Sequence, residues 1–449
     1  MRHKSAEEPL FGISSKVFAC LLAMLISFYA GDQSFAKVYI DIDSPSFQKF
    51  PIAIPDFKKP DRHIRGQDLS SWFSESLENY LTMSGFFNSI SKKAFLETQN
   101  QTSGPGERID FDSWATIGAE YLVKGGYQHA GASLIAEFRL YDVIRGDLII
   151  GKRYTGKNED KADMVRQFAR EILFALTGDG GVFDTKIAFI IKKGRASDIY
   201  VINFDGSKLA RITDERFMTL SPRWSPDGQY MSYTSYRDGN PDLYVKSVNG
   251  TVTRKIAGYK GINLSGTWSR DGRKILLTTS KDGNEEIYMM DIHTGHLERL
   301  TYHFSIDVSP AWSPDNQKIA FVSNRSGSPQ IYVMDADGNN VRRLTYDGNY
   351  NTSPAWSPRG KRIVYEGLIN GRFQIFSIDE DGANNMQLTS DNADHESPTW
   401  SPDGRYVSYC SKGGVRSGIY VMNANGSNVR LLYGGYDSSI SPSWSPRLK

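Results

Sequence analysis

The chain has 449 residues, with 53 Lys and Arg against 51 Asp and Glu, which gives a formal net charge of +2. This length leaves room for two domains. The near-neutral balance argues against a protein that binds nucleic acid or an anionic membrane through its overall charge. The 41 glycines fit a β protein with many turns.

Residues 1–36 have the features of a secretory signal. The apolar run 17–30 follows Lys16 and is 14 residues long, whereas a membrane-spanning helix needs about 20. Ser34-Phe35-Ala36 places small residues at the −3 and −1 positions, so we expect cleavage before Lys37 rather than an uncleaved anchor. Cleavage leaves Cys410 as the single cysteine, which we expect to be buried as a small apolar side chain.

Residues 37–178 predict an N-terminal α/β domain. Positions 37–43 alternate between polar and apolar residues, as an edge strand or an extended strap does. A second apolar run, 50–57, contains two prolines, which should restrict its pairing to its ends or to a sheet edge.

The next segments of this domain predict helices and strands in turn. A four-residue spacing predicts an amphipathic helix over 67–81, with Asp68 as its N-cap. Its apolar face consists of Leu69, Phe73, Leu77 and Leu81. Three strands are expected over 120–127, 133–141 and 147–154, before a second helix over 161–176 that stops at Gly178.

The remaining chain, 182–449, is an internal repeat. One tryptophan recurs every 44 residues, at Trp224, Trp268, Trp312, Trp356, Trp400 and Trp444. Each copy has a Ser-Pro turn and β-rich runs separated by turn signals such as Asp337-Gly338. Four short strands in roughly 40–45 residues are typical of a β-propeller blade.

The copy number predicts six blades. The second and third strands of the repeat each occur six times, the first copy lacks an upstream Trp strand, and Trp444 stands alone near the C-terminus. We therefore predict an all-β six-bladed β-propeller over 182–449. In it the C-terminal strand closes the first blade, which removes an exposed sheet edge.

Function is expected where the six blades differ. Six connecting segments of seven residues have unrelated sequences: 214–220, 258–264, 302–308, 346–352, 390–396 and 434–440. They carry eight acids against two cations, a formal −6 with His neutral, and interleaved aromatic residues. Such a rim suits a basic or mixed protein surface. Its carboxylates could also hold Ca²⁺ at the channel, the one candidate cofactor. An ordinary solvated ring of loops is the alternative.

Catalytic motifs are absent from the sequence. It has no Gly-x-Ser-x-Gly turn, no His-Glu-x-x-His and no Walker loop. We therefore expect no enzyme, no catalytic residue and no dedicated metal site.

The ordered set of segments resembles a known family. A signal peptide, a small α/β domain and six repeats of Ser-Pro-x-Trp-Ser-Pro-Asp-Gly with Ile-Tyr-Val-Met-Asp-x-Asp-Gly resemble the TolB family of the Tol–Pal system, over about 37–449. The resemblance implies a monomeric, non-enzymatic scaffold in the periplasm. It also implies that the propeller loop face binds the lipoprotein Pal, that the N-terminal strap binds TolA, and that other outer-membrane proteins are further partners. The implied role is to support outer-membrane integrity and cell division.

The resemblance also implies site residues. The Pal-facing candidates are Ile262, Asn263, Asp307, Val308, Tyr350, Asp394, His395, Glu396 and Asp437. The strap candidates for TolA are Lys37, Val38, Tyr39, Ile40, Asp41, Ile42 and Asp43. The chain departs from the repeat at Gly266 and Arg270, where Pro is usual, and at Asn316, where Gly is usual.

Two other classes of protein stay open. A propeller enzyme, such as a polysaccharide lyase-like protein with a metal in the channel, needs clustered histidines, and the seven histidines of this chain are scattered. A propeller cut from a serine peptidase needs a hydrolase domain of about 200 residues, larger than the part outside the repeat.

Overall fold

The computed structural model describes residues 48–58, 68–96, 109–414, 416–435 and 439–448. All described residues lie in one compact unit, Asp41–Lys449. The predicted signal peptide, the strap candidates Lys37 to Asp43 and the loop candidate Asp437 lie outside the described residues. No helix in the described part of the chain is long and apolar enough to cross a membrane.

The N-terminal domain contains a mixed five-stranded sheet. Its order is β2 (Phe87–Ser89), β1 (Phe50–Ala53), β3 (Tyr121–Ala130), β4 (Ser133–Asp142), β5 (Asp147–Lys157). β1 runs parallel to β2 and β3, whereas β3, β4 and β5 are antiparallel. The three strands predicted for this region are confirmed, each extended by a few residues.

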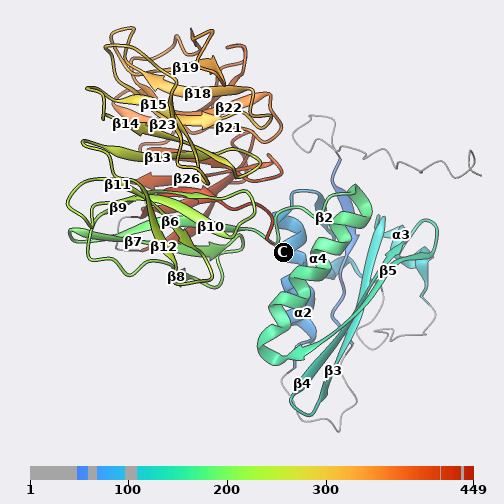
Figure 1. Ribbon diagram of the computed structural model, residues 1–449. Coiled ribbons are helices and arrows are strands. Elements are labelled where there is room, and N and C mark those ends of the chain that lie inside the picture. The colour runs from blue at the N-terminus through green and yellow to red at the C-terminus, as the bar shows by residue number, and fades with distance from the viewer. Residues whose placement is uncertain (1–47, 59–67, 97–108, 415, 436–438, 449) are drawn as a thin grey trace, which may run out of the picture. The chain divides into compact units, whose positions relative to one another are not determined.

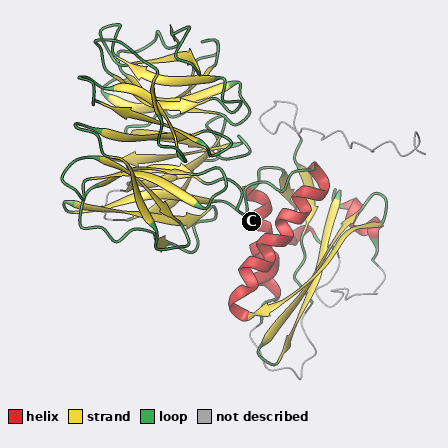
Figure 2. Ribbon diagram, in the orientation of Figure 1, coloured by secondary structure: helices red, strands yellow, loops and turns green. Residues whose placement is uncertain are grey.

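The helices of this domain are α2 (Ser70–Met83), α3 (Phe111–Thr116) and α4 (Lys161–Thr177), with short 3₁₀ turns at Lys92–Ala94 and Asn158–Asp160. α2 and α4 lie side by side on one face of the sheet (Figure 2). The four predicted apolar positions of α2 are all buried. α4 ends at a left-handed Gly178, as predicted.

An aromatic core joins the two helices to the sheet. Phe138 of β4 packs against Phe57 (ring centroids 5.2 Å apart) and against Phe168 of α4 (4.9 Å). Phe73 of α2 stacks on Phe57 at 5.5 Å. Gly125 of β3 lies against this cluster, where an added Cβ would come within 2.2 Å of the Phe57 ring. Any larger residue at 125 would push that ring out of the core.

Two local predictions need correction. The run 50–57 pairs through its first four residues, β1, as one of the two predicted alternatives requires, but β1 is not an edge strand because it has a neighbour on each side. Pro51 is tolerated inside β1 because its carbonyl still accepts from the Glu120 amide, so the sheet loses a single donor. The N-cap of α2 is Leu69 instead of Asp68, although the Asp68 carboxylate accepts from the Ser70 amide at 3.1 Å and so satisfies one free donor.

The rest of the chain is a six-bladed β-propeller of four-stranded antiparallel sheets (Figure 1). From the innermost strand outward, blade 1 contains β29 (Ser439–Trp444), β6 (Lys186–Lys193), β7 (Ala196–Asn203) and β8 (Ala210–Arg211). In the same order, blade 2 contains β9 (Thr219–Trp224), β10 (Tyr230–Ser235), β11 (Asp242–Ser247) and β12 (Thr253–Ala257). Blade 3 contains β13 (Asn263–Trp268), β14 (Lys274–Thr279), β15 (Glu286–Asp291) and β16 (Leu297–Arg299).

The other three blades repeat this pattern. Blade 4 contains β17 (Asp307–Trp312), β18 (Lys318–Ser323), β19 (Gln330–Asp335) and β20 (Arg342–Arg343). Blade 5 contains β21 (Asn351–Trp356), β22 (Arg362–Ile369), β23 (Arg372–Asp379) and β24 (Met386–Gln387). Blade 6 contains β25 (Asp394–Trp400), β26 (Tyr406–Lys412), β27 (Gly418–Asn423) and β28 (Arg430–Gly434).

Ring closure follows the prediction. The C-terminal strand β29 pairs with β6, with Trp444 opposite Ile187, and so completes blade 1. Each innermost strand contacts the next around the ring, and β29 contacts both β25 and β9. The innermost strands therefore surround one central channel. The loop face is the end where these strands begin, and the turn face is the end where each Trp leads into the Ser-Pro turn.

The repeated tryptophans pack between neighbouring blades. Trp400 of blade 6 lies in a buried cluster with Val364 and Ile375 of blade 5, and its indole N–H donates to the Ala355 carbonyl at 3.0 Å. Trp312 similarly joins blade 4 to blade 3 residues such as Leu276. The scaffold role predicted for these residues is therefore confirmed.

A β-bulge explains the serine of the Ser-Pro repeat. Register shifts interrupt the pairing of each innermost strand with its neighbour. Serines in five of these strands have φ between 51° and 56°: Ser221, Ser309, Ser353, Ser397 and Ser441. A bulge bends the strand and increases its twist. The serine of the repeat therefore stands where the backbone has a positive φ, which could not be recognised from the sequence.

Candidate functional site

In five of the six blades, a buried polar side chain near the start of the third strand holds a connection of the loop face. In blade 3 the fully buried Glu286 carboxylate accepts from the His303 amide at 2.8 Å and pairs with Arg299 at 3.0 Å. In blade 4 the Gln330 amide oxygen accepts from Asn351 at 2.8 Å. The equivalent residues in three other blades are Asp198, Asp242 and Gln374. These hydrogen bonds and ion pairs fix the conformation of the loops.

Three predicted Pal-facing residues are buried and act within this framework. Asn263 is fully buried and donates to a main-chain carbonyl of its own loop at 2.8 Å. Asp307 is also fully buried and pairs with Arg325 at 2.7 Å, and burial raises the pKa of the Asp307 carboxyl. His395 Nε2 lies 2.8 Å from the Asp391 carboxylate. Their role in partner binding stays a prediction, and their visible role is to shape the loops.

The other described candidates lie at the channel rim. Asp394 pairs with Arg372 at 3.0 Å, and Glu396 pairs with Lys412 at 2.5 Å. Ile262 and Val308 are partly buried. Tyr350 is 40% exposed and packs edge-on against Phe373.

The formal charge of −6 overstates the negative character of this face. Glu215 is buried, pairs with Arg237 and accepts from the Tyr233 and Ser235 hydroxyls. Four more of the eight loop acids also have cationic partners: Asp214, Asp307, Asp394 and Glu396. Because a paired carboxylate projects a weak field into solvent, charge is a secondary feature of this surface.

Exposed aromatic and aliphatic side chains dominate the loop face instead. The most exposed are Phe304 (89%), Tyr302 (73%) and Tyr346 (72%). Smaller exposed contributions come from Phe217, Met218, Ile306 and Tyr350. Several large exposed apolar side chains on one face are a feature of interaction sites on monomeric proteins.

Two arginines hold the aromatic rings in place. Arg299 lies over the Tyr302 ring at 4.6 Å, and Arg343 lies over the Tyr346 ring at 4.8 Å. The His303 ring stacks on Phe304 at 4.3 Å. Such contacts fix side chains before a partner arrives, which reduces the entropy lost on binding.

Tyr302, Phe304 and Tyr346 are not among the site candidates predicted from the sequence, although the aromatic residues of the loops were expected to contribute to the rim. The available signal was Arg-Leu-Thr-Tyr, which occurs in blades 3 and 4 and in no other blade. The leucine and threonine of this motif are buried within the blade, whereas the tyrosine is exposed and is not needed for the packing of the blade.

Chemistry in the described part of the chain is sparse. No group of three or more His, Cys, Asp or Glu side chains among the described residues could hold a metal ion. Cys410 is buried, and burial raises the pKa of its thiol to about 12, so it is unreactive at neutral pH. Calcium, the candidate cofactor, stays an untested prediction.

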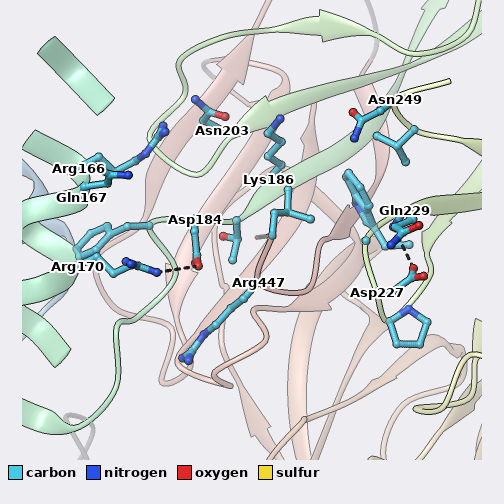
Figure 3. A pocket seen from close by; sticks show the side chains of 17 residues that line it. Arg166, Gln167, Arg170, Asp184, Lys186, Asn203, Asp227, Gln229, Asn249 and Arg447 are labelled. Carbon is cyan, nitrogen blue, oxygen red and sulfur yellow. Dashed lines mark hydrogen bonds and ion pairs between the residues drawn. The ribbon is translucent and has the colours of Figure 1, made fainter. Parts of the chain in front are cut away.

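A separate cavity of about 860 Å³ lies away from the loop face (Figure 3). α4 contributes Arg166, Gln167 and Arg170, and the propeller contributes residues that include Asp184 and Arg447. Arg170 lies 3.9 Å from Asp184, an ion pair drawn in Figure 3. Each of the three arginines that line this cavity pairs with a carboxylate.

The fold and this site define a six-bladed β-propeller protein with a preceding α/β domain and an aromatic loop face suited to docking. A family model described as the TolB beta propeller domain matches residues 174–448, and one described as the TolB amino-terminal domain matches 38–149. The chain belongs to the TolB family.

Individual relatives agree with this assignment. The chain is 50% identical over 234 residues to the Tol-Pal system protein TolB of Syntrophus aciditrophicus, covering 51% of this chain and 52% of that one. It is 39% identical over 203 residues to the protein of the same name from Desulfosudis oleivorans, covering 45% and 46%. The matches thus span about half the length of these curated relatives.

A solved structure matches over a longer range. TolB from Acinetobacter baumannii is 27% identical, with a TM-score of 0.75 over 89% of this chain and 97% of that one.

Proposed function

We propose that this protein is a non-enzymatic periplasmic scaffold of the Tol–Pal system whose propeller loop face binds the lipoprotein Pal. The exposed aromatic cluster of blades 3 and 4 carries this proposal. Phe304, Tyr302 and Tyr346 present large apolar areas that scaffold packing does not use, and aromatic residues are enriched among those that dominate binding energy.

The loop acids have a secondary role in this proposal. Asp394 and Glu396 each offer one carboxylate that already has a cationic partner. They orient a partner and exclude wrong ones more than they add affinity. Calcium at the loop-face carboxylates is proposed only as an ion that strengthens this contact.

The N-terminal strap, residues 37–43, is the proposed TolA-binding segment. Its alternating polar and apolar residues suit an extended peptide that adds to the edge of a partner sheet. Deleting residues 37–43 should abolish TolA binding and leave a folded propeller that still binds Pal. Through these two contacts the protein supports outer-membrane integrity and cell division.

Calorimetric titration of residues 37–449 with the periplasmic domain of Pal tests the proposal. We expect saturable one-to-one binding, and tighter binding with Ca²⁺ if an ion sits at the interface. A folded protein that gives no binding heat with or without Ca²⁺ would contradict the Pal proposal and favour the propeller-enzyme alternative.

A further inference from the structure

The turn-face end of the propeller channel contains a cavity of about 630 Å³. Its walls come from all six blades and consist mainly of the Ser, Pro and Trp residues of the repeat. Among the described residues that line it none is Asp or Glu, and the two charged ones are Arg223 and Arg270. The volume lies within the range of about 300–1,000 Å³ common for small-molecule sites.

The repeats show that Arg223 is not a scaffold residue. It occupies the variable position of Ser-Pro-x-Trp in β9. The other five innermost strands carry Thr267, Ala311, Ala355, Thr399 and Ser443 there. Because five equivalent strands fold with small neutral residues at this position, the arginine must be explained by something other than the fold.

The Arg223 guanidinium lacks a carboxylate partner among the described ion pairs. Its contact within the chain is a hydrogen bond from Nη1 to the Pro222 carbonyl at 3.0 Å. Burial lowers the pKa of Arg223 to about 10, and no nearby carboxylate offsets this effect. A partly buried cation without a counter-charge is costly, and an anion bound beside it would remove that cost.

Three further departures from the repeat line the same cavity. Gly266 and Arg270 replace prolines, and Asn316 replaces a turn glycine. Without the proline ring, residue 270 has an amide, which donates to the Asn316 side-chain oxygen at 3.0 Å. Arg270 and Asn316 thus act together to place a second guanidinium at the cavity that contains Arg223.

The cavity in Figure 3 provides a contrast. Its arginines have carboxylate neighbours: Arg166 with Asp163, Arg170 with Asp184, and Arg447 with Asp179. The acids nearest the channel cavity are engaged in their own turns. Asp271, for example, accepts from the Ser269 hydroxyl at 2.6 Å and from the Arg273 amide at 3.0 Å. Among the described ion pairs, the arginines of the Figure 3 cavity therefore have carboxylate partners, whereas Arg223 and Arg270 of the channel cavity have none.

We propose that the turn-face cavity binds a small organic oxyanion, a carboxylate or a phosphate ester, with Arg223 as the main anchor and Arg270 as the second. A guanidinium offers parallel N–H donors that match either group. The lining serine and threonine hydroxyls add further donors, and the Trp and Pro walls accommodate a carbon skeleton. This site is distinct from the loop face and does not depend on Pal binding.

Titration calorimetry of the purified protein at low ionic strength tests the site, with inorganic phosphate and citrate as probes and glycerol as the neutral control. We expect at least one anion to bind saturably with a Kd below about 1 mM. Binding of phosphate alone, or of citrate alone, identifies the preferred oxyanion. If neither anion binds up to about 10 mM, the proposal is wrong.

Matched variants locate the binding. Arg223→Thr introduces the residue that β13 and β25 already carry, so the propeller should fold, and we expect anion affinity to fall by about tenfold or more. Arg270→Ala keeps the amide that bonds to Asn316 and should weaken binding by about threefold. Arg273→Thr removes an exposed charge from the same turn outside the cavity and should change nothing.

The shift of the melting temperature with added anion tests the same site without relying on the heat of binding. A ligand that binds the folded state raises Tm, so the anion should raise the Tm of the unmodified protein and of Arg273→Thr but not of Arg223→Thr. Equal stabilisation of all three proteins would show that the anion does not bind at Arg223.

Discussion

The two faces of the propeller differ in what they repeat. On the turn face, Ser-Pro-Asp-Gly returns with few changes, and each Asp holds the hydroxyl two residues before it, as Asp315 holds Ser313 at 2.5 Å. On the loop face, six connections of equal length have unrelated sequences. Positions that keep the same residue in all blades serve the scaffold. A position where one blade differs from the others therefore indicates a role beyond folding. The aromatic cluster and Arg223 are two such departures.

The largest expected effect comes from the constant set. Trp400→Ala removes a side chain that is 7% exposed and wedged between blades 5 and 6, so it should lower the free energy of unfolding by about 3–5 kcal/mol. Phe304→Ala, at 89% exposure, should change stability by less than about 0.5 kcal/mol. Denaturant titration measures both, and similar losses for the two variants would break the distinction between scaffold and surface.

The loop face should dominate binding. Tyr302→Ala with Phe304→Ala should weaken Pal binding by about 100-fold, because such aromatic anchors contribute most of the affinity of an interface. The control is Phe174→Ala, which removes another exposed ring (59% exposed) from α4. Calorimetric titration compares the affinities of the two variants for Pal. If the control bound Pal as weakly as the double variant, the effect would not be specific to the loop face.

One buried acid makes the folding stability of the propeller depend on pH. Glu366 of β22 accepts from the Ser397 amide at 2.5 Å, and burial together with nearby Glu396 raises the pKa of its carboxyl to about 7, although Lys412 opposes this shift. The folded state then keeps a proton that the unfolded chain releases above its usual pKa of 4.5. The stability that protonated Glu366 provides is therefore present below pH 4.5 and is lost as pH rises through about 7.

Glu366→Gln cannot ionise and should flatten this slope. At pH 8 it should raise the free energy of unfolding by on the order of 1–3 kcal/mol. The exposed Glu298→Gln of β16 is the control and should leave the profile unchanged. Denaturant unfolding from pH 4 to pH 8 gives the two profiles. A Glu366→Gln profile that still falls over this window would assign the pH dependence to another group.

The smallest expected effect belongs to the loop acids. Asp394→Ala with Glu396→Ala should weaken Pal binding by less than about tenfold, because Arg372 and Lys412 already neutralise both carboxylates. Thermal stability should change little, since neither side chain is fully buried. A loss greater than that of the aromatic double variant would restore charge as the main feature of the loop face.

The architecture was predictable because it repeats. The 44-residue tryptophan spacing determined blade number, strand order and the closing role of β29, and four-residue spacing determined the buried face of α2. The central position of β1 could not be predicted. Pro51 has no backbone N–H to donate, but the sequence does not show that its carbonyl accepts a hydrogen bond from a neighbouring strand.

The site was less predictable, for a physical reason. Counting acids in the loops cannot show their partners, because these lie on other strands: Glu215 pairs with Arg237, 22 residues away. Exposure likewise depends on tertiary packing, so sequence did not distinguish buried Asn263 from exposed Phe304.

Hydrogen–deuterium exchange of the protein with and without the periplasmic domain of Pal tests the central distinction between the two faces most directly. The loop-face proposal predicts protection of segments 302–308 and 346–352 on binding, with unchanged exchange in the turns 225–228 and 313–316. Protection of the turns with unchanged loops, or no protection of either, would contradict the assignment of the aromatic loop face as the docking surface.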